Sequence, residues 1–177
     1  ELTDILELDA TNAKALLLQG RMYAAQAAQA QRENDEPLMN SKFEAALVAI
    51  RESLTQDPDS SEAYLVLGQI LMMQENIEEA KEALENAIAA DSENVDAYLT
   101  LATIAFRQQD IAEAETLYQK VLEIDPESLK GLAGSAELYV LRTNYAEAIE
   151  AASKVLELAP GTEGSPPREL ISAHFTL

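Results

Sequence analysis

The sequence predicts an all-α fold in which antiparallel helix pairs stack in a row, an α-solenoid. Three observations predict it. Alanines recur every 34 residues, at Ala46, Ala80, Ala114 and Ala148. Large aliphatic residues recur in the same frame, at Leu54, Ile88, Leu122 and Leu156. Good helix formers dominate the chain, and no run alternates apolar and polar residues as a half-buried strand does.

Residues 1–60 depart most from this period. We expect residues 1–12 to be the end of a truncated repeat, because Leu2, Ile5 and Leu6 fit the second half of a helix that closes at Asn12. Residues 13–60 then hold about 14 residues more than one period. We predict an extended helical hairpin with about two further turns on each helix, and Pro37 as the first residue of the second helix. A rival interpretation starts that helix at Ser41 and leaves residues 34–40 as a loop.

Residues 61–94, 95–128 and 129–162 are three regular repeats. In the first of them we predict a helix A over residues 62–74, a turn at Glu75 and Asn76, and a helix B over residues 77–90. The other two repeats follow the same pattern. Asn76, Asp110 and Asn144 are the expected N-caps of helix B. The Asp57-Pro58 and Asp125-Pro126 pairs end helix B, because proline disfavours the helical conformation in the residue before it.

Small residues predict where the two helices of each pair approach. Helix A supplies a glycine or an alanine, and helix B supplies the recurring alanine. Two antiparallel helices joined by a short turn must lie close, and small side chains permit that approach. The expected helix A residues are Gly20, Gly68, Ala102 and Ala136.

Residues 163–177 are expected to be a linker followed by the start of another truncated repeat. Gly164, Ser165, Pro166 and Pro167 have linker composition, and residues 173–177 align with residues 63–67. The chain is therefore expected to be a piece of a longer array. His174, the only histidine, then takes the place of a core aromatic residue rather than of a ligand.

Composition excludes several functions. The chain has no cysteine, and its formal net charge is −20. Phosphate binding requires clustered Lys and Arg, so nucleic acid is excluded as a partner and anionic membranes are disfavoured. No apolar run is long enough to predict membrane insertion. We expect no catalytic residues, no metal and no cofactor. Composition assigns no compartment, since it suits both the cytoplasm and the bacterial periplasm.

The repeats resemble the tetratricopeptide repeat (TPR). The TPR pattern consists of a large residue, then Leu-Gly, then Ala, and then another large residue. The residues that follow it here are Tyr64, Leu67, Gly68, Ala80 and Leu84. The third regular repeat departs from it, with Ser135 in place of leucine and Ala152 in place of an aromatic residue. The resemblance implies a right-handed superhelix whose inner groove is lined by helices A.

Helix positions counted from Tyr64 predict the residues that line such a groove. A groove that mixes apolar and polar side chains suits an extended peptide or an amphipathic helix. The alternative is that the apolar members only seal one helix A against the next. The matching positions do not hold the Lys and Asn clamp with which some TPR proteins bind a C-terminal carboxylate, since only Lys130 fits. The expected groove residues are Leu17, Arg21, Leu65, Gln69, Met73, Leu99, Thr103, Arg107, Lys130, Glu137 and Leu141.

Three functional hypotheses follow. The leading one is a non-enzymatic scaffold that binds a partner's peptide or helix in this groove, within a larger assembly or secretion-type protein. The second is the regulatory or substrate-recruiting arm of a multidomain enzyme such as a transferase. The third is self-association, in which repeat ends of different chains stack on one another.

Overall fold

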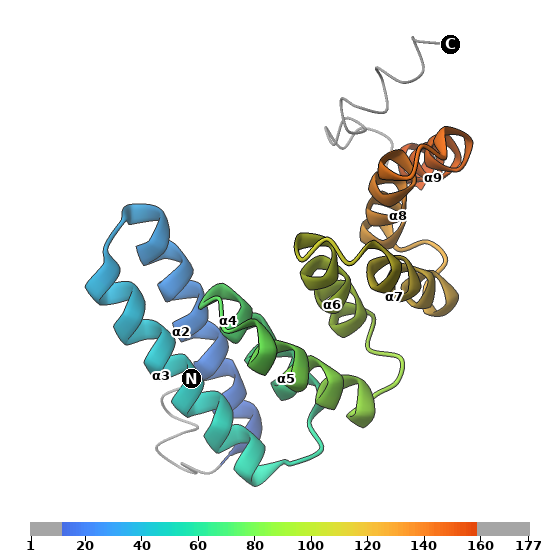
Figure 1. The fold of residues 1–177 in the computed structure, drawn as a ribbon. Coiled ribbons are helices and arrows are strands. Elements are labelled where there is room, and N and C mark those ends of the chain that lie inside the picture. Colours follow the sequence, from blue (N-terminus) through green and yellow to red (C-terminus); the bar gives the residue numbers. More distant parts are fainter. Residues whose placement is uncertain (1–11, 159–177) are drawn as a thin grey trace. The chain divides into compact units, whose positions relative to one another are not determined.

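The computed structural model describes residues 12–158, and this range contains eight α-helices and no strand (Figure 1). The all-α class predicted from the sequence is confirmed. The truncated repeat end before residue 12, the linker and repeat start at residues 163–177, and His174 lie outside the described residues. The helices are α2 (Ala13–Glu33), α3 (Glu36–Gln56), α4 (Ser61–Met73), α5 (Ile77–Ala90), α6 (Val95–Arg107), α7 (Ile111–Ile124), α8 (Leu129–Leu141) and α9 (Tyr145–Leu158).

The chain divides into two compact units, residues 1–97 and residues 98–177. In the first unit, α2 packs on α3, α4 packs on α5, and the second pair contacts the first through α4. In the second unit, which holds most of α6, α7 packs on α8 and α8 on α9. A hydrogen bond between Thr103 and Tyr118 joins α6 to α7.

Small residues bring the two helices of a pair together. A Cβ added to Gly20 would lie 2.4 Å from the Ile50 Cδ1 atom and 3.4 Å from the carbonyl oxygen of Ala46. At Gly68 it would lie 2.6 Å from the Leu84 Cγ atom and 3.1 Å from the carbonyl oxygen of Ala80. The predicted approach of helix A to the recurring alanine is therefore present in both pairs of the first unit.

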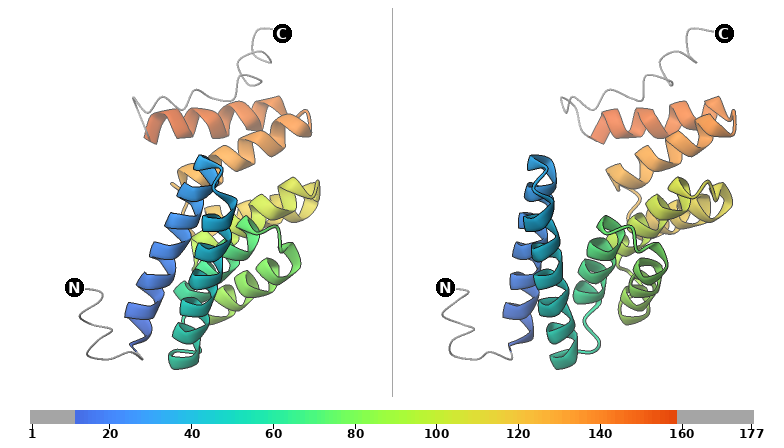
Figure 2. Two further views of the ribbon diagram at one scale, coloured as in Figure 1. Left: turned by 90° about the vertical axis from the view of Figure 1, so that its left-hand side faces the viewer. Right: turned by 60° about the vertical axis from the view of Figure 1, so that its left-hand side comes forward.

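The first helix pair is longer than the others. Both α2 and α3 have 21 residues, against 13 in α4 and 14 in α5, and they run side by side past the end of α4 (Figures 1 and 2). The added turns of α2 are packed, since Ala27 and Ala30 are at most 1% exposed. Asp35 caps α3 by accepting from the N–H of Leu38 at 3.1 Å. The rival interpretation, a loop over residues 34–40, is wrong.

The helix caps match the prediction in part. Asp110 accepts a hydrogen bond from the N–H of Glu113 at 3.0 Å, as expected of an N-cap. Asn76 is the N-cap residue of α5, as predicted, but its side chain does not make the expected capping hydrogen bond. Its backbone N–H instead donates to the Leu71 carbonyl at 2.9 Å, which closes the turn after α4. The N-caps of helices A were not predicted. In each of them the side chain accepts a hydrogen bond from a backbone N–H, and the four capping residues are Asn12, Ser60, Asn94 and Ser128.

Each turn from helix A to helix B contains one residue with left-handed backbone. In the three regular turns it is Glu75 (φ 63°), Gln109 (φ 63°) and Thr143 (φ 60°). The long hairpin has Asn34 (φ 56°) at this place. A left-handed residue just past a helix end lets the following N–H groups reach the last free carbonyls. The three regular turns therefore share one geometry, and none of them contains glycine.

Tyr118 on α7 packs over Gly134 on α8. A Cβ added to Gly134 would lie 2.2 Å from the Tyr118 Cζ atom, so only glycine leaves room for this ring. The tyrosine is 8% exposed. The third regular repeat, which departs from the repeat pattern, is thus joined to the preceding helix pair by an aromatic residue of that pair.

Candidate functional site

The expected groove residues all lie on helices A, namely α2, α4, α6 and α8, but they differ in exposure. Leu17, Leu65 and Leu99 are only 6–8% exposed, so they present little surface to a partner. The remaining positions keep surface. Gln69, Met73 and Thr103 are half-buried, while Arg21, Arg107, Lys130, Glu137 and Leu141 are exposed.

In the first unit, three of the expected residues surround one hollow between α2 and α4. Arg21, Gln69 and Met73 line it, and its volume is about 230 Å³. Leu17 and Leu65 are not part of this lining. The other lining residues were not predicted from the sequence, although the alanine-rich run that begins at Ala24 was an indication of them. They are Ala24, Ala25, Ala28, Val66 and Ile70.

The charged member of this hollow has a partner on the next helix A. The Nη1 atom of Arg21 lies 2.7 Å from the Oε1 atom of Glu62. The pair joins the first turn of α4 to the middle of α2. The guanidinium charge at the hollow is therefore balanced within the protein.

In the second unit, two of the expected residues, Thr103 and Glu137, influence Tyr118. Burial raises the pKa of the Tyr118 hydroxyl above its ordinary value, a hydrogen bond with Thr103 offsets part of this rise, and the negative charge of Glu137 adds to it. The Thr103 hydroxyl donates its proton to the Leu99 carbonyl at 2.9 Å. Leu141, at the end of α8, is 58% exposed and is the most accessible apolar residue of the set.

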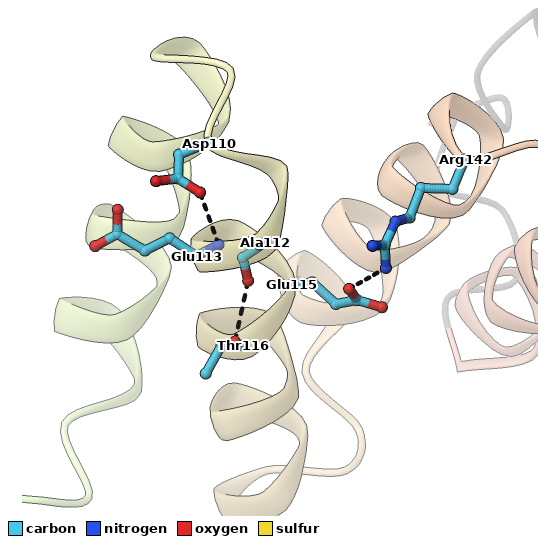
Figure 3. Close-up of polar contacts among 6 residues, drawn as sticks. All are labelled: Asp110, Ala112, Glu113, Glu115, Thr116 and Arg142. Carbon is cyan, nitrogen blue, oxygen red and sulfur yellow. Dashed lines mark hydrogen bonds and ion pairs between the residues drawn. The ribbon is translucent and has the colours of Figure 1, made fainter.

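Polar contacts at the start of α7, and between α7 and the end of α8, are structural. Figure 3 shows Asp110 accepting from the backbone N–H of Glu113, and the Thr116 hydroxyl donating to the Ala112 carbonyl. The same figure shows Arg142, just after α8, in an ion pair with Glu115 on α7. These contacts fix helix ends and the stacking of α8 on α7.

The described part of the chain contains neither a metal-ligating cluster nor a membrane-spanning helix. Within residues 12–158, no three His, Cys, Asp or Glu side chains gather in a way that could hold a metal ion. None of the described helices is long and apolar enough to cross a membrane. What the helices A do offer is a mixed surface of apolar, amide and charged side chains, of the kind that binds peptides.

Comparison with known proteins gives the same fold. Residues 21–164 match the family model described as the cytochrome c-type biogenesis protein H TPR domain. A crystal structure of MamA is 24% identical, has a TM-score of 0.69, and the alignment covers 89% of this chain and 84% of that one. A second MamA crystal structure is also 24% identical, with a TM-score of 0.66 and 89% and 78% coverage.

PilF of Pseudomonas aeruginosa is a third similar structure. It is 19% identical, with a TM-score of 0.70 and coverage of 89% of this chain and 68% of that one. No curated protein sequence matches the chain. At these identities the three structures support a common fold and nothing finer.

Proposed function

The chain belongs to the family of the cytochrome c-type biogenesis protein H TPR domain, and from this membership we propose that it is a scaffold that holds a segment of a partner protein along its helices A. TPR domains are generally non-catalytic interaction modules, and we propose the same for this chain. The family description suggests that the partner takes part in cytochrome c assembly.

The hollow between α2 and α4 carries this proposal. It is open, and it lies where two successive helices A meet, so a bound segment would contact both. The accessible residues at the corresponding positions of the later helices are Thr103, Arg107, Lys130, Glu137 and Leu141. The buried Leu17, Leu65 and Leu99 would support these helices from behind rather than contact the partner.

The partner segment is best described as a peptide or amphipathic helix with basic residues. The net charge of −20 attracts cationic chains and repels nucleic acid and anionic lipid. Apolar residues of the segment would face apolar side chains such as that of Met73, and its basic residues would face the acidic surroundings.

Site-specific photo-crosslinking tests the proposal. A photoreactive residue placed at Met73, Thr103 or Leu141 should crosslink one and the same protein in native extract. Matched controls are exposed residues on helices B, at Glu82, Glu85 and Glu150. Equal crosslinking from helices A and helices B would refute the helix A surface as the binding face.

A further inference from the structure

The hollow between α2 and α4 depends on the extension of the first helix pair. A 13-residue helix such as α4, begun at Ala13, would end at Ala25. Ala28, which lines the hollow, is present on α2 only because the helix continues to Glu33. A regular repeat would therefore lack this part of the wall.

We propose that this hollow binds one bulky apolar side chain, a Leu, Met or Phe carried by the partner segment. The inference rests on the proposed function and adds the chemistry of one contact to it. The occupant is defined by the lining, the charge balance and the size of the hollow.

The lining is mainly apolar. Of the eight lining residues, six are Ala, Val, Ile or Met. Burying an apolar side chain against such surface gains roughly 25 cal/mol per Å² removed from water. Met73 adds an adaptable wall, because an unbranched thioether chain can follow the shape of different side chains.

The charge balance argues against an acidic occupant. The only charged lining residue is Arg21, and Glu62 already neutralises it at 2.7 Å. A carboxylate entering the hollow would meet no free positive charge there, and it would be repelled by the net charge of −20. The other polar lining residue, Gln69, offers an amide that suits the backbone of a bound segment.

The size limits the occupant to a single side chain. The hollow of about 230 Å³ is smaller than the roughly 300–1,000 Å³ of pockets that hold drug-sized ligands. The alanines at positions 24, 25 and 28 provide this space, since a larger side chain at any of them would project into it.

Small probes test the inference directly. In an NMR titration of the whole chain, N-acetyl-phenylalaninamide should shift the signals of Met73, Ala25 and Ala28, and N-acetyl-aspartamide should not. Ala28→Leu fills the hollow and should weaken binding of the phenylalanine probe at least tenfold. Ala25→Leu provides a second variant, and because Ala25 is exposed its replacement leaves the core intact.

Controls separate this inference from the proposed function. Ala89→Leu, a matched change at an exposed alanine of α5, should leave probe binding unchanged. Probe binding that persists in Ala28→Leu and Ala25→Leu would overturn the inference, even if crosslinking from Thr103 and Leu141 upholds the scaffold. The two substitutions could instead abolish probe binding and leave partner crosslinking from Met73 unchanged. That result would also overturn the inference, since the partner would then not use the hollow.

Discussion

Arg21 on α2 and Glu62 on α4 form an ion pair that bridges two successive helices A, with 2.7 Å between Nη1 and Oε1. Their side chains are 45% and 56% exposed, so solvent screens the attraction. Such pairs contribute at most about 1 kcal/mol to stability. The pair therefore matters more for the charge of the neighbouring hollow than for the fold.

Removing Glu62 should change which ligands the hollow accepts. In Glu62→Gln the positive charge of Arg21 is no longer balanced. N-acetyl-leucine, which carries a carboxylate, should then bind about two- to fivefold more tightly than to the wild type, as expected for one exposed charge pair. Binding of the neutral N-acetyl-leucinamide should not change. An NMR titration measures both, and an unaltered ratio of the two affinities would contradict the assigned charge balance.

Gly134→Ala should destabilise the second unit although alanine is the better helix former. Helix propensity favours alanine by about 1 kcal/mol, but its Cβ would lie 2.2 Å from the Tyr118 ring. The ring is buried and bonded to Thr103, so it cannot move away cheaply. We expect a net loss of about 1–2 kcal/mol in urea unfolding. In a Tyr118→Ala background the same substitution should become neutral or stabilising.

The contact between Tyr118 and Gly134 marks the limit of what the repeat pattern predicts. The period places each helix, because one small residue per helix fixes the approach within a pair, as at Gly68 and Ala80. Contacts between pairs depend on which side chain of one repeat meets which gap in the next. The repeat pattern does not single out Gly134, and only the structure reveals that its missing side chain makes room for a ring.

The candidate site, like the fold, could be predicted from the sequence only in part. The spacing of the repeats predicted Arg21, Gln69 and Met73 as candidate residues, and these line the hollow. The apolar candidates Leu17, Leu65 and Leu99 proved buried. Counting positions along a helix predicts which way a side chain points, but it does not predict whether neighbouring side chains cover it. The length of the α2 extension was predictable from the about 14 residues that residues 13–60 hold beyond one period, whereas the space beside Ala28 was not.

Two residues at equivalent positions should respond differently to truncation. Asp110 accepts from the Glu113 N–H at 3.0 Å, and Asn76 makes no such bond. Asp110→Ala should therefore cost about 1 kcal/mol, the usual value of an N-cap. Asn76→Ala should cost clearly less. Urea unfolding of the two variants measures the difference, and equal losses would mean that the Asn76 side chain caps α5 in solution.

Replacing Thr143 by glycine should stabilise the protein. Thr143 has φ 60°, a conformation that costs an L-residue about 1–2 kcal/mol and suits a β-branched side chain least. Glycine removes this cost but loses about 0.4–1 kcal/mol through the greater freedom of the unfolded chain. We expect a net gain of up to about 1 kcal/mol in thermal or urea unfolding. Thr116→Gly, within α7, should instead destabilise, and a loss in both variants would show that Thr143 is not strained.

The raised pKa of Tyr118 should make stability depend on pH in the alkaline range. Burial keeps this hydroxyl protonated in the folded state at pH values where the unfolded chain, with a pKa of about 10, already ionises. The resulting stabilisation is fully present below the unfolded pKa and is lost as the pH rises through the folded pKa. The free energy of unfolding should therefore fall more steeply above pH 10 in the wild type than in Tyr118→Phe. Urea unfolding between pH 8 and pH 11 measures this, because the other titrating groups are common to both proteins. Parallel pH profiles would show that Tyr118 titrates alike in the folded and unfolded chains, and the contact with Gly134 would then not shield the hydroxyl.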